Sequence, residues 1–163
     1  MRLSRLIPSL VGLWSLLTAQ TAAFAQGRPL PSQSVVGLWQ QVDDQGRVGA
    51  WFLFSEVNGE YQGRIAKAFP RRGEPVMDTC QRCPGNQRGA KMVGLAIVSG
   101  MKRQGLHYGD GNILDPRDGS VYSAEMDLSP DGQTLQVRGY LGLPLFGQTQ
   151  VWTRLPDSAL SAK

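Results

Sequence analysis

The triplet Gly37-Leu38-Trp39 opens the first strand-like segment of this 163-residue chain, and Trp152-Thr153-Arg154 closes the last one. In an antiparallel barrel whose strands follow chain order, the first and last strands are neighbours. Trp39 and Arg154 can then meet where the wall closes, with the guanidinium lying flat on the indole face as a cation–π pair. The sequence therefore predicts that Gly37, Trp39 and Arg154 close a barrel.

Extended segments alternate with turn signals from Val35 onward. They predict strands at 35–42, 47–57, 60–68, 92–101, 104–109, 120–128, 133–141 and 148–155. Asn58-Gly59 supplies the positive φ angles of a tight hairpin turn, and Asp110-Gly111-Asn112 is interpreted as another turn. Closure removes exposed sheet edges, so eight hairpin-linked strands predict an all-β, up-and-down antiparallel barrel, with a two-sheet sandwich as the alternative.

The amino-terminal segment has the pattern of an export signal. Arg2 and Arg5 precede a short apolar core, and Ala23-Phe24-Ala25 fits a cleavage site. We expect a signal peptide at 1–25, a flexible lead-in at 26–34, one barrel domain at 35–156 and a C-terminal tail at 157–163. The product is then periplasmic or secreted, and no later segment is long and apolar enough to span a membrane.

The charge pattern does not favour a nucleic-acid-binding protein. The whole chain carries 17 basic and 13 acidic residues, and two of the arginines leave with the signal peptide. The remaining basic residues are dispersed, whereas a nucleic-acid reader normally shows a basic stripe with interleaved aromatic residues.

Two runs, 50–54 and 92–98, are apolar on both faces. The wall of a barrel in water is polar outside, so the outer faces of these runs need a cover. We expect either the long segment 69–91 or a second copy of the chain to provide it, which makes a homodimer one of the two predictions.

Cys80 and Cys83 are the only cysteines and form a Cys-x-x-Cys motif in a long loop. In an exported protein, a structural disulfide that shapes the loop is the favoured interpretation. A redox-active dithiol and a metal site are the alternatives. The first normally opens a helix beside a βαβ unit, and a zinc site needs two further ligands.

No other pattern predicts catalysis. His107 has only Asp110 near it in sequence as a partner for general-base work, and no glycine-x-serine-x-glycine elbow is present. The oxygen-bearing residues of 110–118 are better explained by turn formation than by an incomplete calcium loop. The sequence thus predicts no catalytic residue, no metal and no cofactor.

Seven short strings are spread in order over nearly the whole barrel domain: Gly37-Leu38-Trp39-Gln40, Gly63-Arg64-Ile65, Cys80-Gln81-Arg82-Cys83-Pro84-Gly85, Gly94-Leu95-Ala96-Ile97, Gly111-Asn112-Ile113-Leu114-Asp115-Pro116, Val137-Arg138-Gly139-Tyr140 and the segment 146–154. Together they resemble a bacterial family of exported proteins catalogued as DUF2147. The resemblance implies a lipocalin-like (calycin) barrel, in agreement with the strand count, and brings no enzyme activity.

The candidate lining of the barrel interior is a set of apolar strand residues: Phe52, Phe54, Ile65, Leu95, Ile97, Tyr122 and Met126. An eight-stranded barrel is about wide enough to be filled by side chains or to hold one small ligand. The leading hypothesis is a lipocalin-like protein that binds a small, largely apolar molecule, such as a lipid or fatty acid, inside the barrel without catalysis. The alternatives are a filled barrel that acts as a protein-interaction module of the cell envelope and, less favoured, a thiol redox protein.

Overall fold

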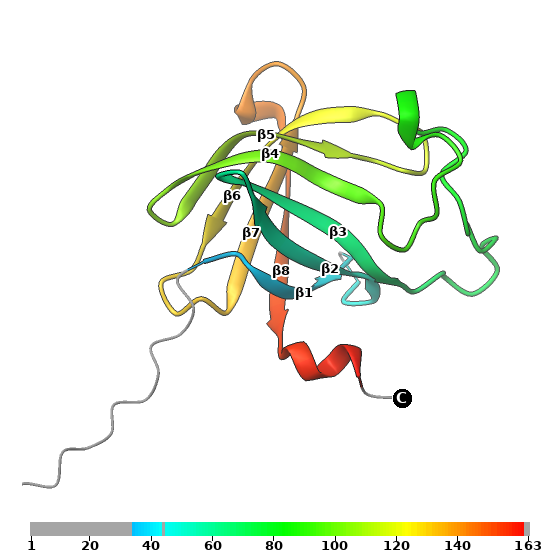
Figure 1. Ribbon diagram of the computed structural model, residues 1–163, viewed down its shortest axis with the longest axis horizontal. Helices are drawn as coiled ribbons and strands as arrows, with labels where there is room; N and C mark the ends of the chain where they lie inside the picture. The colour runs from blue at the N-terminus through cyan, green and yellow to red at the C-terminus, as the bar shows by residue number, and fades with distance from the viewer. Residues whose placement is uncertain (1–33, 44, 162–163) are drawn as a thin grey trace, which may run out of the picture.

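A computed structural model of the chain describes residues 34–43 and 45–161. Over this part the chain forms eight strands: β1 Gly37–Val42, β2 Val48–Val57, β3 Glu60–Ala68, β4 Ala96–Gln104, β5 His107–Leu114, β6 Val121–Leu128, β7 Thr134–Tyr140 and β8 Gln148–Leu155. Each strand pairs antiparallel with the next one, and β8 pairs with β1 to close the barrel (Figure 1). The predicted up-and-down barrel is confirmed. The predicted signal peptide and residues 26–33 of the lead-in lie outside the described residues.

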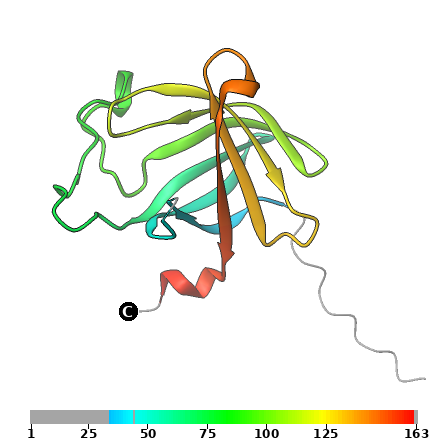
Figure 2. The same ribbon diagram turned by 180° about the vertical axis from the view of Figure 1, so that it is seen from behind.

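Short 3-10 turns, and no α-helix, complete the described part of the chain. They are η1 Gly85–Gln87, η2 Pro144–Phe146 and η3 Asp157–Leu160. Figure 2 shows η3, in red, directly after the end of β8, inside the segment predicted to be a tail. Within the described ranges, no helix is long and apolar enough to cross a membrane.

The fourth and fifth strands differ most from their predicted bounds. β4 begins at Ala96 and not at residue 92, and β5 continues to Leu114 instead of ending at residue 109. Asp110, predicted to lie in a turn, has a φ of 60° inside β5, where the pairing with β6 shifts register. A β-bulge needs the same residue types as a turn, because it also places a residue at positive φ.

Large side chains fill the barrel from its middle to the end at which residue 34 enters. Phe54, Tyr61, Tyr108 and Met126 are each at most 6% exposed. Tyr61 and Tyr108 meet edge to face, with ring centroids 5.0 Å apart. A Cβ on Gly63 would lie 2.7 Å from the Phe54 ring, so the glycine makes room for this ring.

The long β3–β4 connection, residues 69–95, covers part of the outer wall. The pairing of β3 with β4 shifts register between Gly63 and Arg64, which face Val98 and Ala96, so Ile97 lies at an irregularity of the sheet. Ile97 is buried, and the connection meets β4 beside it through a hydrogen bond from the Gln87 side-chain N–H to the Ala96 carbonyl at 3.1 Å. The connection therefore packs against the start of β4, as expected for a cover of run 92–98.

Trp51 is the outward-facing aromatic residue of the other two-sided run. Its ring meets Phe69 edge to face at 5.3 Å between centroids, and the Lys67 Nζ lies 5.1 Å from the indole centroid. The Trp51 Nε1–H donates to the Gln40 side-chain oxygen at 3.1 Å. Side chains of the neighbouring strands and of the first residue of the β3–β4 connection thus lie against this tryptophan.

Candidate functional site at the open end of the barrel

One end of the barrel is sealed, and we call it the closed end. It carries the β2–β3, β4–β5 and β6–β7 turns. Here Trp39 and Arg154 pair across the β1–β8 seam, and the Arg154 Cζ lies 4.2 Å from the indole centroid. The Trp39 Nε1–H donates to the Val35 carbonyl at 2.7 Å. The structure thus brings together the tryptophan and the arginine that the sequence places at the closure.

Arg154 also ties three chain segments together through its guanidinium. It donates to the carbonyls of Gly132, Val36 and Ser34 at 2.6, 2.8 and 2.5 Å. A Cβ on Gly37 would lie 2.8 Å from the Arg154 Nη1, and the Gly37 φ of 122° also favours glycine. Burial lowers the pKa of the Arg154 guanidinium. These contacts seal the closed end.

At the opposite end, which we call the open end, inward-facing positions keep contact with solvent. Trp152 is buried, and Gln150 takes the next inward position on β8, opposite the buried Val137. Gln150 is nonetheless exposed. Ile113 and Tyr122 pair across β5 and β6 on the inward face and are only half-buried. Solvent therefore reaches the interior from this end.

Aromatic rings form the floor of the open end. Phe52 and Trp152 stack with ring centroids 4.4 Å apart and an interplanar angle of 11°. Phe54 meets Trp152 edge to face at 6.2 Å between centroids. The Trp152 Nε1–H donates to the Gln150 side-chain oxygen at 3.0 Å. The open end thus combines an apolar floor with an exposed amide beside it.

The structure separates the residues that the sequence predicts as ligand lining. Six of the seven are buried: Phe52, Phe54, Ile65, Leu95, Ile97 and Met126. Tyr122 keeps partial exposure at the open end. The prediction omits Ile113, Trp152 and Gln150, although period-two alternation backward from Trp152 points to Gln150.

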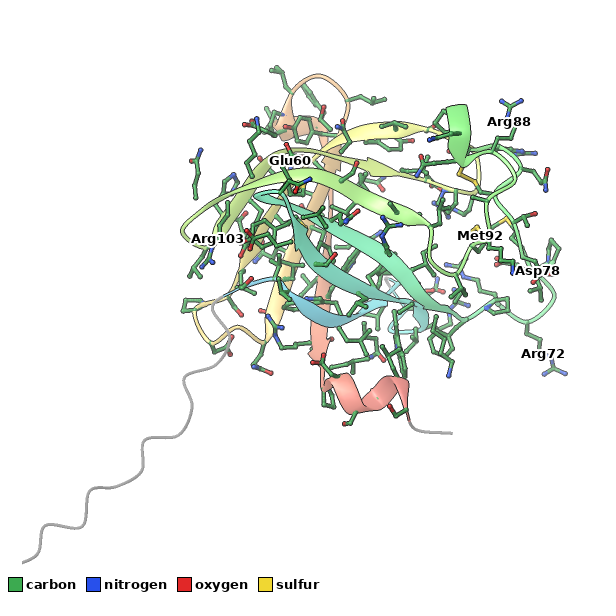
Figure 3. All side chains as sticks on the ribbon, in the orientation of Figure 1. Glu60, Arg72, Asp78, Arg88, Met92 and Arg103 are labelled. Atoms are coloured by element: carbon green, nitrogen blue, oxygen red, sulfur yellow. A yellow bond between two sulfur atoms is a disulfide. The ribbon has the colours of Figure 1, made fainter. Side chains whose placement is uncertain are left out.

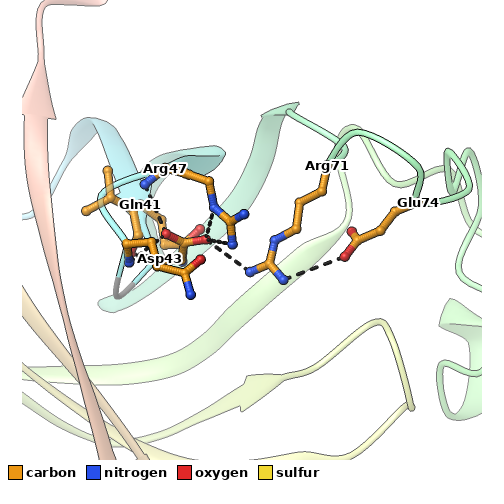
Figure 4. Close-up of polar contacts among 7 residues, drawn as sticks. Gln41, Asp43, Arg47, Arg71 and Glu74 are labelled. Atoms are coloured by element: carbon orange, nitrogen blue, oxygen red, sulfur yellow. Dashed lines mark hydrogen bonds and ion pairs between the residues drawn. The ribbon is translucent and has the colours of Figure 1, made fainter.

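Three arginines stand at the rim of the open end around a hollow of about 520 Å³. Asp43, in the β1–β2 turn, lies 2.8 Å from the Arg47 guanidinium and 3.1 Å from that of Arg71, which also lies 3.6 Å from Glu74 (Figure 4). Hydrogen bonds from the Arg47 backbone N–H and side chain lower the pKa of Asp43 to about 2. Arg72 lines the same hollow and forms no ion pair with a described residue. Two of the three arginines thus pair with carboxylates, and Arg72 does not.

The cysteines and the single histidine have structural partners. Cys80 and Cys83 form a disulfide in which both residues are buried, so the predicted disulfide is confirmed. The His107 Nδ1 lies 2.8 Å from an Asp127 carboxylate oxygen on the outer surface, and not beside Asp110. Among the described residues, no group of three or more histidine, cysteine, aspartate or glutamate side chains is arranged to hold a metal ion.

An eight-stranded, up-and-down barrel with one sealed and one open end is a lipocalin-like barrel. The family model described as "Uncharacterized protein conserved in bacteria (DUF2147)" matches residues 37–154, and the chain belongs to this family. The barrel is similar to the solved structure of protein HP1028 from the human pathogen Helicobacter pylori, which belongs to the lipocalin family. The two share 19% sequence identity with a TM-score of 0.66, over 78% of this chain and 87% of that one. No curated protein matches the chain.

Proposed function

We propose that this protein binds a small, largely apolar molecule at the open end of its barrel and carries out no reaction on it. The observation that supports the proposal is the partial exposure of Ile113 and Tyr122, two inward-facing residues beside an aromatic floor. A ligand that covers them removes apolar surface from water, which favours binding by roughly 25 cal/mol for each Å² of apolar surface buried. The packed closed half leaves the open half as the place for the ligand.

Polar groups at the rim would orient such a ligand. Gln150 offers an exposed amide next to the floor, and Arg47, Arg71 and Arg72 stand beside the rim hollow. Guanidinium groups bind carboxylates through paired hydrogen bonds. A molecule with an apolar body and an anionic end, as in a fatty acid, suits this arrangement.

The location of the protein is part of the proposal. We infer that it works outside the cytoplasm, because residues 1–25 have the pattern of an export signal. The Cys80–Cys83 disulfide supports the same inference, since disulfides persist in oxidising compartments. Immunoblotting of periplasmic, secreted and cytoplasmic fractions is the test, and full-length protein confined to the cytoplasm would contradict the inference.

A charge placed on the inward face tests the ligand site. Ile113→Asp puts a carboxylate at the open end, whereas Asn112→Asp adds the same charge on the exposed outer face of the same strand. With the fluorescent fatty acid cis-parinaric acid as probe, we expect I113D to weaken binding at least about tenfold, because the ligand would bury an unpaired charge. N112D should bind as the unaltered protein does.

Two controls make this experiment decisive. Circular dichroism and thermal unfolding establish that both variants keep the barrel. Equal affinity of I113D and N112D, or no parinaric acid binding by the unaltered protein, would overturn the proposed site.

A filled barrel that acts through its surface is the second candidate, and the close packing of the closed half favours it. It predicts that purified protein carries no apolar molecule and does not bind parinaric acid. Native mass spectrometry of the protein isolated from its own cells separates the two candidates, because a retained small molecule supports the first and none is expected for the second.

A further inference from the structure

Exposed apolar residues are concentrated at the open end. The six most exposed large apolar residues of the described chain all lie in its loops: Val76, Val93, Leu141, Leu143, Leu145 and Phe146. These are 61–78% exposed, whereas the three at the closed end, Val36, Val57 and Leu160, are 41–45% exposed. Four of the six fall in residues 141–146 of the β7–β8 connection, which we call the apolar loop. It contains no charged residue, and a contiguous exposed apolar patch marks an interaction site.

Hydrogen bonds hold the apolar loop in a defined conformation. Arg138, on the outer face of β7, donates to the carbonyls of Pro144 and Leu145 at 2.7 and 3.3 Å and to the Thr149 hydroxyl at 2.8 Å. The Phe146 N–H donates to the Leu143 carbonyl at 3.1 Å. These bonds satisfy the carbonyls of Leu143, Pro144 and Leu145 within the protein while the apolar side chains of the loop face solvent. A segment that enters lipid needs this arrangement, because lipid offers no hydrogen bonds to backbone groups.

The apolar loop is too small to hold two copies of the chain together. Four side chains fall well short of the roughly 800 Å² per partner that a stable protein interface buries. The loop instead projects from the barrel as a narrow tip (Figure 1). A narrow apolar tip is suited to insertion between lipid headgroups.

The charge of the open end indicates the kind of lipid surface. The β3–β4 connection carries five basic and two acidic residues, while the β1–β2 and β5–β6 turns together carry two basic and four acidic residues. Arg72, Arg82, Arg88 and Lys91 form no ion pair with any residue that the structure describes. Arg72 and Arg88 are directed away from the barrel (Figure 3). These basic residues, on a connection at the same end of the barrel as the apolar loop, complement a surface of anionic lipid.

We propose that the apolar loop inserts into the surface of a bilayer that contains anionic lipid, with the open end of the barrel facing the membrane. The inference goes beyond ligand binding and does not depend on it. In this orientation the open end lies next to the bilayer, from which an apolar ligand can enter or into which it can leave.

Vesicle sedimentation tests the proposal with residues 26–163, which hold all eight strands of the closed barrel. The probes are sucrose-loaded vesicles of phosphatidylcholine with and without phosphatidylglycerol. We expect the unaltered protein to sediment with the anionic vesicles, and added salt to weaken the association. The double variant Leu145→Ser with Phe146→Ser should lower the partition coefficient at least about tenfold. The matched variant Val57→Ser with Leu160→Ser, at the closed end, should leave it unchanged.

Three results would overturn the inference. The unaltered protein could stay in the supernatant with both kinds of vesicle, or L145S/F146S could sediment as well as the unaltered protein does. Light scattering could also show that L145S/F146S converts a dimer to a monomer while no form binds vesicles, which would assign the loop to self-association. Parinaric acid binding separates this inference from the proposed ligand site, because L145S/F146S should keep it and I113D should lose it.

Discussion

The closed and open ends of this barrel use an arginine in opposite ways. At the closed end Arg154 stacks on Trp39 and donates to three backbone carbonyls, which draws three segments into one seal. Near the open end Arg138 also donates to three oxygens, yet it holds the apolar loop with its side chains facing solvent. A similar set of bonds thus seals the barrel at one end and holds exposed apolar side chains in place near the other.

The largest expected difference comes from removing these two guanidinium groups. Arg154→Met leaves three carbonyls at a partly buried site without their donor, and we expect the free energy of unfolding to fall by about 3–5 kcal/mol. Arg138→Met acts at the surface, where water replaces the lost donors, and should cost about 1 kcal/mol. Urea unfolding of both variants measures the contrast, and equal losses would show that the two ends do not differ in stability.

A smaller contrast comes from two glycines at positive φ. Gly37→Ala strains a φ of 122° and pushes a Cβ to 2.8 Å from the Arg154 Nη1, so we expect a loss of about 2–3 kcal/mol. Gly73 in the β3–β4 connection has a φ of 88° and open space around it, and Gly73→Ala should cost about 1 kcal/mol. Thermal unfolding is the measurement, and a milder effect at Gly37 than at Gly73 would contradict the tight seal.

Removing the disulfide should act locally. The ring between Cys80 and Cys83 is short, so replacing both by serine should lower the free energy of unfolding by no more than about 2 kcal/mol. We expect hydrogen exchange to speed up in residues 78–95 while β1 and β8 keep their protection. Loss of protection across the β1–β8 seam would mean that the two ends are coupled.

The smallest effect is a dependence on pH at the rim of the open end. The pKa of Asp43 is about 2 in the folded protein against an ordinary 3.8, so its ionised form stabilises the fold at neutral pH. That stabilisation is lost as the pH falls from about 4 toward 2. The difference in unfolding free energy between the unaltered protein and Asp43→Asn should therefore shrink over this range, in urea titrations at each pH. A constant difference would contradict the role of the Arg47 bonds.

Local sequence signals predicted most of the fold. The Asn58-Gly59 pair has φ angles of 54° and 81° in the hairpin between β2 and β3, as its composition indicates. Trp39 and Arg154 could be placed together because closure makes neighbours of the strands that carry them. The first inference needs a single turn, and the second needs only the order of the strands along the chain.

The parts that the sequence did not reveal depend on register and on long-range packing. Asp110-Gly111-Asn112 has the composition of a turn but forms a bulge, which a one-dimensional pattern does not distinguish. Ile97 lies where the pairing of β3 with β4 shifts register, and the alternation of a single strand does not reveal such a shift. Which half of the barrel is filled by side chains depends on the packing of all eight strands together. The composition of the chain therefore does not predict it.

Two tryptophans test the central claim that ligands bind at the open end. Trp152 lies in its floor and Trp39 in the closed end, and each has its indole N–H hydrogen-bonded. In a titration of ¹⁵N-labelled protein with a fatty acid, we predict that the Trp152 indole resonance shifts while that of Trp39 stays in place. A shift of Trp39 with Trp152 unchanged, or no shift of either resonance at saturating fatty acid, would contradict the account.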